Sequence, residues 1–267
     1  MSLPLGLKDP IPGVVPLRLA TYIRPSQLPT PPETFGHMDL VSDWGMLANG
    51  PGHDNPPEIP DGVGDCAIAG PMHQIMLNCA ESKKPVSFSA PTAVKVYSDI
   101  TGYVLGDSGT DDGTSIDQMA QYWLTQGILD DSGAPHRIVA FVDLNPGDVR
   151  EFWIAMFLFQ SAGLGFALPD SAEEQTNEGK PWDVVPGAQI VGGHYVPAFN
   201  KLNAQLNAGV SWGSPQQFTT RFFQKYNNQG VVVLDEEMLT NMRSVDGFDD
   251  QQLRDDIEQL KRERSWL

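Results

Sequence analysis

Residues 65–80 read Asp-Cys-Ala-Ile-Ala-Gly-Pro-Met-His-Gln-Ile-Met-Leu-Asn-Cys-Ala, and this stretch decides the predicted fold. Pro71 falls within its first turns and should kink them. Cys66 stands at the first turn, where the positive end of a helix dipole favours a nucleophilic thiolate. A lone buried cysteine is more often inert, so Cys66 gains significance only with a base. Apolar side chains recur at helical spacing along the stretch and predict a helix with one buried face: Ile68, Met72, Ile75, Met76 and Cys79.

Outward from this helix, helical patterns dominate the first half of the chain and strand patterns the second. Further helices are predicted from Ser89 onward and over 115–126, 148–160 and 214–226. Strands are predicted over 137–142, 163–168, 194–199, 209–212 and 230–234. This segregation indicates an α+β fold rather than alternating α/β units.

A candidate base for the thiol lies in the second half. Gly192 and Gly193 precede His194, which enters an apolar strand. A thiol nucleophile needs such a base from elsewhere in the fold, although a lone histidine here is more often a satisfied core residue. Trp212 ends a later strand, where it either shields a catalytic pair from water or is an ordinary core tryptophan. His73 lies two helical turns from Cys66, too far for a direct base.

The order of these motifs resembles the papain family of cysteine peptidases, over about residues 40–240. The matching segments are Asp43-Trp44-Gly45, Gly64-Asp65-Cys66-Ala67, Gly193-His194, Ser211-Trp212-Gly213 and the closing strand 230–234. The resemblance implies a papain-like α+β fold, in which the nucleophile helix packs on an antiparallel sheet or barrel. It also implies Cys66 as the nucleophile and His194 as its base. The chain further resembles uncharacterised bacterial and bacteriophage proteins, in residues 44–47, 64–66, 180–184 and 192–196.

Two positions depart from the papain pattern. Val210 stands where the family has the asparagine that orients the histidine, and a valine side chain offers no hydrogen bond. Pro60 stands where the family has the glutamine of the oxyanion hole. The long polar loop over 48–62 supplies either Asn49 or Asn55 instead, and we favour Asn49. The backbone N–H of Cys66 would be the second donor.

The composition of the chain excludes some classes of binding partner. The formal net charge is −17, which disfavours nucleic acid and anionic membranes as partners. The histidines form no metal-ligand spacing with either cysteine, and no phosphate-binding glycine loop occurs, so no metal or cofactor is expected. Both cysteines are expected to be reduced. Residues 1–7 lack the features of a signal peptide, which favours a location in the cytoplasm or within a virus particle.

Three segments are expected: a proline-rich arm over 1–43 that wraps over the domain, a papain-like domain over 44–240, and an amphipathic helix over 241–267. Two functions remain open. The first is a thiol hydrolase, a peptidase or amidase, that acts on a peptide or protein through a thioester. The second is a catalytically weak or silent structural or decoration protein, possibly of a bacteriophage particle, that contacts other subunits through its arm and terminal helix.

Overall fold

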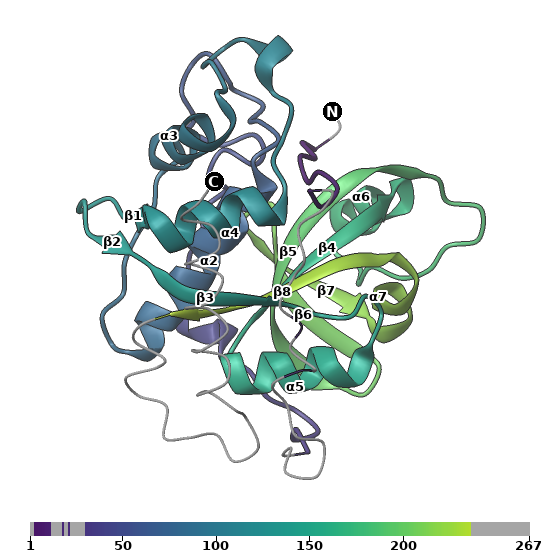
Figure 1. Cartoon of the computed structure of the whole chain (residues 1–267). Helices are drawn as coiled ribbons and strands as arrows, with labels where there is room; N and C mark the ends of the chain where they lie inside the picture. Colours follow the sequence, from purple (N-terminus) through teal and green to yellow (C-terminus); the bar gives the residue numbers. More distant parts are fainter. Residues whose placement is uncertain (1–2, 12–17, 19–20, 22–29, 236–267) are drawn as a thin grey trace.

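The structure, a computed structural model, describes residues 3–11, 18, 21 and 30–235. A helical half and a half built on a β-sheet lie side by side (Figure 1). The helical half comes first in the chain and the sheet second, so the predicted α+β class is confirmed. The terminal helix predicted over 241–267 falls outside the described residues.

The helical half follows the predicted pattern closely. It contains α2 (Cys66–Glu81), α3 (Ala90–Thr101) and α4 (Ile116–Thr125), with short 3-10 turns η1 (Met38–Leu40) and η2 (Ser108–Thr110). Ser115 and Gln118 form a reciprocal capping box that begins α4. Gly102, in the left-handed conformation, ends α3. The expected apolar face of α2 is buried, and both cysteines are reduced thiols.

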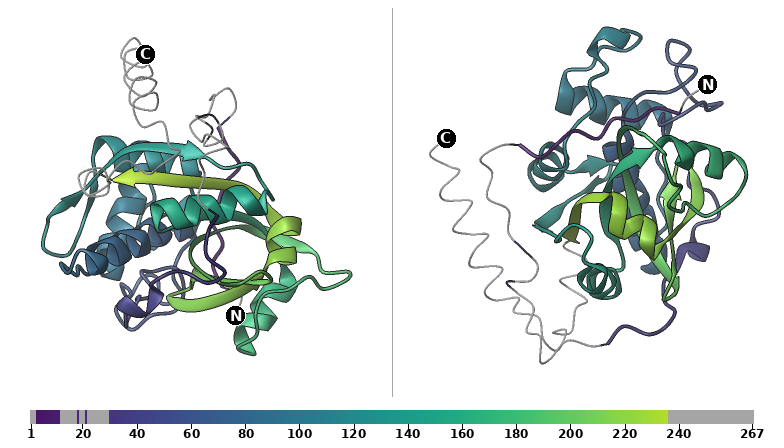
Figure 2. Two further views of the ribbon diagram at one scale, coloured as in Figure 1. Left: turned by 90° about the horizontal axis from the view of Figure 1, so that it is seen from below. Right: turned by 90° about the vertical axis from the view of Figure 1, so that its right-hand side faces the viewer.

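The second half is a six-stranded antiparallel sheet in the order β3-β8-β4-β5-β6-β7. Figure 2 shows that this sheet is strongly twisted and curls over on itself. Helix α6 has no counterpart among the predicted elements. The strands are β3 (Ile138–Asp143), β4 (Ala162–Pro169), β5 (Ile190–Asn203), β6 (Leu206–Ser211), β7 (Ser214–Thr219) and β8 (Asn227–Asp235). The helices of this half are α5 (Val149–Phe159), α6 (Asp170–Asn177) and α7 (Thr220–Tyr226), and a separate hairpin joins β1 (Ile128–Leu129) to β2 (Pro135–His136).

The prediction of one helix over 214–226 is wrong in its first part. Residues 214–219 form β7, which pairs with β6, and only α7 is helical. Trp212 and Gly213 both have positive φ angles, 48° and 68°, and make the tight turn between the two strands. Gln216 and Phe218 are buried while their neighbours are more exposed, which is the two-residue period of a strand.

Strand β5 separates two cores because its successive side chains point to opposite faces. Tyr195 belongs to the core between the sheet and α2, whereas Val196 belongs to the core on the other face. The Tyr195 hydroxyl donates to Gln74 Oε1 of α2 at 2.8 Å, and Gln74 Nε2 donates to Ser161 Oγ at 2.8 Å. This buried chain of hydrogen bonds fixes α2 against the sheet.

Residues 3–8 of the N-terminal arm lie between the two halves. Residues 3–8 run from the sheet side toward α4, and the purple segment in Figure 1 follows this path. Farther along, Phe35 pairs with Lys201 near the end of β5. None of the helices in the described ranges has the length and apolarity that a bilayer crossing requires.

Candidate active site

Cys66 begins α2, as predicted, but its thiol is buried, with 1% of the residue exposed. The backbone N–H of Tyr195 donates to its sulfur at 3.4 Å, and the N–H of Gly6 also hydrogen-bonds it. Burial raises the pKa of the Cys66 thiol to about 11, although these backbone donors oppose the rise. Desolvation therefore outweighs the backbone hydrogen bonds, and the thiol is protonated at neutral pH.

His194 lies on β5 and is fully buried. Its Nε2 makes a 2.8 Å hydrogen bond with the Ser211 hydroxyl. Its ring stacks on Trp212, with centroids 4.5 Å apart and planes 22° apart. Burial lowers the pKa of His194 to about 3, so the imidazole is neutral. Its Nδ1 has no hydrogen-bond partner among the described residues.

The predicted hydrogen bond between Cys66 and His194 is absent from the described part of the chain. The sulfur is instead held by main-chain donors, one of them from Tyr195, the residue next to His194. The His194 ring packs with Trp182 and Trp212 on the face of β5 opposite to the Tyr195 side chain, whereas Cys66 belongs to the core that contains α2, so the two predicted catalytic side chains do not meet. The Nδ1 atom of His194 has no partner among the described residues. An imidazole nitrogen with no partner is available to take up a proton.

Ser211, rather than residue 210, supplies the group that orients His194. Val210 was expected to lie beside the imidazole ring, but adjacent residues of β6 face opposite sides of the sheet. Val210 belongs to the core that contains α2, whereas the Ser211 hydroxyl reaches His194 Nε2. The sequence contained the signal, since Ser211 belongs to the Ser-Trp-Gly motif. Trp212 stacks on the His194 ring, and the shielding role predicted for it stays a prediction.

Asn49 lies near the thiol, as expected of a side chain from the 48–62 loop. Asn49 and Cys66 line the same small cavity of about 10 Å³, which has room for about one water molecule. Asn49 is buried, and its Nδ2 donates to the carbonyl of Val63 at 3.3 Å. Its role as an oxyanion donor stays a prediction. Asn55 donates to carbonyls within its own loop instead.

His73 lines the same cavity but is occupied elsewhere. Its Nε2 lies 3.0 Å from the carbonyl oxygen of Trp44 and 3.1 Å from that of Gly45, so this nitrogen carries the proton and donates. Burial lowers the pKa of His73 to about 4, and the two carbonyl contacts offset part of this. The neutral imidazole donates to two carbonyls and so fixes Trp44 and Gly45, which precede the 48–62 loop, against α2.

Asp65, which sequence reasoning used only as part of a motif, is a fully buried acid beside the thiol. Neither carboxylate oxygen has a partner of ordinary hydrogen-bond geometry among the described residues. Burial raises the pKa of Asp65 well above its usual range, and the charge of nearby Asp111 raises it further. Asp111 itself accepts hydrogen bonds from Gly64 N–H at 3.1 Å and from the Tyr97 hydroxyl at 2.7 Å.

Residues 4–8 fill the cleft beside Cys66, a more specific position than the wrapping over the domain that was predicted for the arm. Trp212 Nε1 donates to the Pro4 carbonyl at 3.3 Å, and Leu7 N–H donates to the Gly193 carbonyl at 3.0 Å. Thr114 on the helical side pairs with Leu7 in a parallel bridge. An open cavity of about 390 Å³ adjoins the sheet-side end of this segment, next to Trp212. The segment thus joins both walls of the cleft and covers the thiol.

Other clusters lie away from this cleft. His136 contacts both Cys79 and Asp130. Its Nδ1 lies 3.9 Å from the Cys79 Sγ, and its Nε2 lies 3.2 Å from the Asp130 Oδ2. Cys79 is 13 residues from Cys66 on one helix, about 20 Å away, so it belongs to no common site. No group of three His, Cys, Asp or Glu residues suited to a metal ion occurs in the described ranges.

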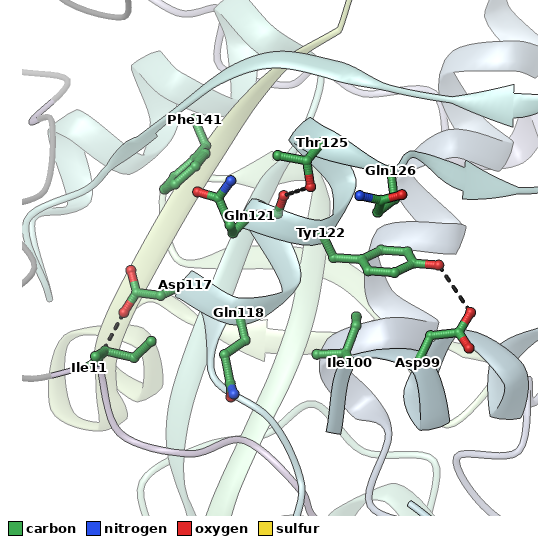
Figure 3. Close-up of a pocket in the computed structure, with 10 residues that line it drawn as sticks. All are labelled: Ile11, Asp99, Ile100, Asp117, Gln118, Gln121, Tyr122, Thr125, Gln126 and Phe141. Atoms are coloured by element: carbon green, nitrogen blue, oxygen red, sulfur yellow. Dashed lines mark hydrogen bonds between the residues drawn. The ribbon is translucent and has the colours of Figure 1, made fainter. Parts of the chain in front are cut away.

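An open groove of about 980 Å³ lies between α3, α4 and β3, and neither Cys66 nor His194 lines it (Figure 3). Its polar groups are partly engaged already. The Tyr122 hydroxyl donates to Asp99 at 3.2 Å, and Asp117 accepts the N–H of Ile11 at 3.0 Å. The groove contains no cysteine or histidine that would provide a nucleophile or a base.

The fold is that of papain-like cysteine proteases. Xylellain, a cysteine protease from Xylella fastidiosa, has a similar structure, with a TM-score of 0.62 at 11% identity over 87% of this chain and 96% of its own. Procathepsin B S9 from Trypanosoma congolense gives 0.58 at 12% identity over 87% of each chain. Procathepsin L 3 from the larval midgut of Tenebrio molitor gives 0.55 at 12% identity, over 82% of this chain and 75% of its own.

At these identities the likeness shows the fold alone. Neither a family model nor a curated protein matches the sequence. The resemblance to bacterial and bacteriophage proteins, and with it the location within a virus particle, stays a prediction.

Proposed function

We propose that this protein is a thiol hydrolase that cleaves a peptide or amide bond, with Cys66 as the nucleophile and His194 as its base. One observation carries the proposal. Cys66 begins a helix and its sulfur accepts the N–H of Tyr195, the residue after His194 in the sequence. The Nε2 of His194 is bonded to Ser211 and its Nδ1 has no partner among the described residues, so the ring would serve as the base once it turns toward the sulfur in an opened cleft. A nucleophile, a base with an available nitrogen and a group that orients the base are the parts that such catalysis needs.

The chemistry follows from these parts. His194 takes the thiol proton while the Cys66 sulfur attacks the carbonyl carbon, and the carbonyl oxygen becomes an oxyanion. The backbone N–H of Cys66 and the Asn49 amide would stabilise that charge. The imidazolium then gives its proton to the departing amine, which leaves a thioester on Cys66. His194 next removes a proton from water, which attacks the thioester and releases the acid and the free thiol.

Residues 4–7 must leave the cleft before this sequence begins. With them in place both reacting groups are neutral, because burial favours the thiol and the uncharged imidazole. Water that enters an opened cleft would lower the pKa of Cys66 and raise that of His194. An opened cleft therefore favours the thiolate and the imidazolium, which is the reactive pair of charges.

The test is a burst experiment on the full chain carrying Gly6→Ala, a change that disfavours the resident segment. The probe is the p-nitrophenyl ester of N-acetylglycine. We expect rapid release of about one nitrophenol per chain and an acyl group on Cys66, detected by mass spectrometry of its peptide. Cys66→Ser should abolish the burst, and His194→Ala should slow it by about 100-fold or more. Cys79→Ser is the matched control and should leave the burst unchanged.

A structural role is the second candidate, and the filled cleft is the observation that favours it. A protein that served only in an assembly would tolerate a covered, neutral thiol and imidazole permanently. Absence of acylation in a folded Gly6→Ala chain, with Cys66 accessible to iodoacetamide, would favour this role and contradict the hydrolase proposal.

A further inference from the structure

We propose that the cleft recognises an extended peptide in which a glycine stands between two apolar residues, with residues 5–7, Leu-Gly-Leu, as the built-in template. This proposal specifies the substrate class of the proposed hydrolase and rests on it for the chemistry alone. The recognition itself rests on how residues 4–8 are held.

The template is held through its main chain from both sides. Leu7 N–H donates to the Gly193 carbonyl at 3.0 Å on the sheet side. On the helical side, Thr114 N–H donates to the Gly6 carbonyl at 2.9 Å, and Lys8 N–H donates to the Thr114 carbonyl at 2.9 Å. Hydrogen bonds of this kind read an extended backbone, whatever its side chains, as in the addition of a strand to a sheet edge. Any peptide that adopts the same path can make them.

Glycine is selected at the centre of the path. A methyl group on Gly6 would collide with the carbonyl oxygen of Gly64, immediately before the nucleophile helix. That oxygen belongs to the main chain, and the Gly64 N–H is tied to Asp111 at 3.1 Å, so the wall cannot retreat as a flexible side chain would. Every residue other than glycine is therefore excluded at the position that faces the Cys66 sulfur.

The two walls of the cleft also have glycines where they contact the template, because a side chain there would collide with it. A methyl group on Gly113 would collide with the Gly6 carbonyl, and one on Gly193 would collide with the Leu7 carbonyl. Gly113 also has a φ of +72°, which favours glycine independently of the occupant. Gly64 and Gly113 thus abut Gly6, and Gly193 abuts Leu7, where the main chains of the template and of the two walls pass in close contact.

Apolar residues are selected on both sides of the glycine. Leu7 is buried in the core that contains α2, and its Cδ2 would lie 2.7 Å from a methyl group on Gly165. In the other direction, Leu5 packs over Gly192 and lines the 390 Å³ cavity together with Leu3. An apolar side chain on each side of the glycine therefore finds a complementary surface.

The test compares two labelled hexapeptides, Leu-Pro-Leu-Gly-Leu-Lys and Leu-Pro-Leu-Ala-Leu-Lys, by fluorescence anisotropy. The protein is the full chain with Gly6→Ala, to free the cleft, and Cys66→Ser, to prevent turnover. We expect the glycine peptide to bind at least about tenfold more tightly than the alanine peptide. Adding Gly193→Ala should remove this binding. The chain with Lys8→Ala in place of Gly6→Ala is the matched control, and since its segment stays seated it should bind neither peptide.

Equal affinities for the two peptides, or binding of neither by a folded protein, would overturn the proposal. Circular dichroism and the thermal midpoint establish folding. If Gly6→Ala prevents folding, Leu7→Ala serves as a second variant, because it removes atoms and weakens the resident segment without adding a clash. The Leu7→Ala chain must show the same preference for the glycine peptide. Because Cys66→Ser removes turnover from the measurement, selective binding without hydrolysis by the Gly6→Ala chain that retains Cys66 would contradict the hydrolase proposal and leave this one standing.

Discussion

Replacing Gly6 by alanine should expose Cys66 and increase its reactivity. The new methyl group would collide with the Gly64 carbonyl, which belongs to a rigid loop. A clash of this kind costs about 1–3 kcal/mol. The question is whether that cost exceeds the free energy that holds residues 4–8 in the cleft.

The segment is held by a small margin. Burial of Leu7 contributes about 1.5–3 kcal/mol. Five hydrogen bonds contribute about 0.5–1.5 kcal/mol each: three main-chain bonds to Gly193 and Thr114, and those from Trp212 to Pro4 and from Gln229 to Lys8. Ordering the five residues 4–8 costs about 1–2 kcal/mol per residue. The favourable and unfavourable sums are of similar size, so a clash of about 1–3 kcal/mol is enough to shift the population toward the open cleft.

The expected change in reactivity is large. With the pKa of the Cys66 thiol at about 11, its ionised fraction at pH 7.5 is about 300 times smaller than that of a free thiol with a pKa of about 8.5. The higher intrinsic nucleophilicity of a more basic thiolate offsets about tenfold of this. The unmodified chain should therefore react about 20-fold or more slowly than free cysteine, before restricted access slows it further.

The assay is the rate of iodoacetamide alkylation of Cys66 at pH 7.5, followed by mass spectrometry of the peptide that contains it. Gly6→Ala should bring the rate to that of free cysteine or above, and Lys8→Ala, at an exposed side chain, should not change it. If the unmodified chain already reacts as fast as free cysteine, the segment does not protect the thiol and the reasoning fails. Equal slow rates in the unmodified chain and a folded Gly6→Ala variant would refute it as well.

Two further predictions concern stability. Asp65→Asn should stabilise the protein at pH 7, on the order of 1 kcal/mol, because it removes a carboxyl that burial disfavours in its charged form. Since the folded-state pKa of Asp65 is raised, its effect is most favourable below about pH 4 and is lost as pH rises toward that folded-state pKa, so urea unfolding should show the gain at pH 7 and none at pH 3.5. Gly70→Ala should destabilise the fold by about 1–3 kcal/mol, because its methyl group would collide with the Tyr195 ring, and an unchanged urea midpoint would show that α2 and β5 are not packed this closely.

Most of the fold was predictable because its signals are local. The three- and four-residue spacing of apolar side chains in α2 and the cap at Ser115 depend on neighbours in the sequence. The segment 214–219 was misassigned because Ser214-Pro215 is typical of a helix start, whereas its pairing with β6 is a tertiary contact. Strand pairing depends on a partner elsewhere in the chain, so local propensity does not determine it.

The state of the candidate site could not be predicted from its residue types. Motif order proposes Cys66 and His194, yet the pKa of the thiol depends on burial by a segment 60 residues away in the sequence. The position of Cys66 at the start of a helix, taken alone, predicts a lowered thiol pKa, which is the opposite of the shift that burial causes. Ser211 was overlooked because the choice between it and Val210 depends on which face of β6 turns toward the imidazole, and a single residue of register decides this.

The buried chain from Tyr195 through Gln74 to Ser161 constrains how the protein can move. It connects β5, α2 and the start of β4 with two 2.8 Å hydrogen bonds inside the core. A hinge between the nucleophile helix and the sheet would leave all three polar groups without partners in an apolar interior. Movement of residues 4–8 out of the cleft costs less free energy than such a hinge motion. The two halves therefore act as a fixed frame, and residues 4–8 are the movable part.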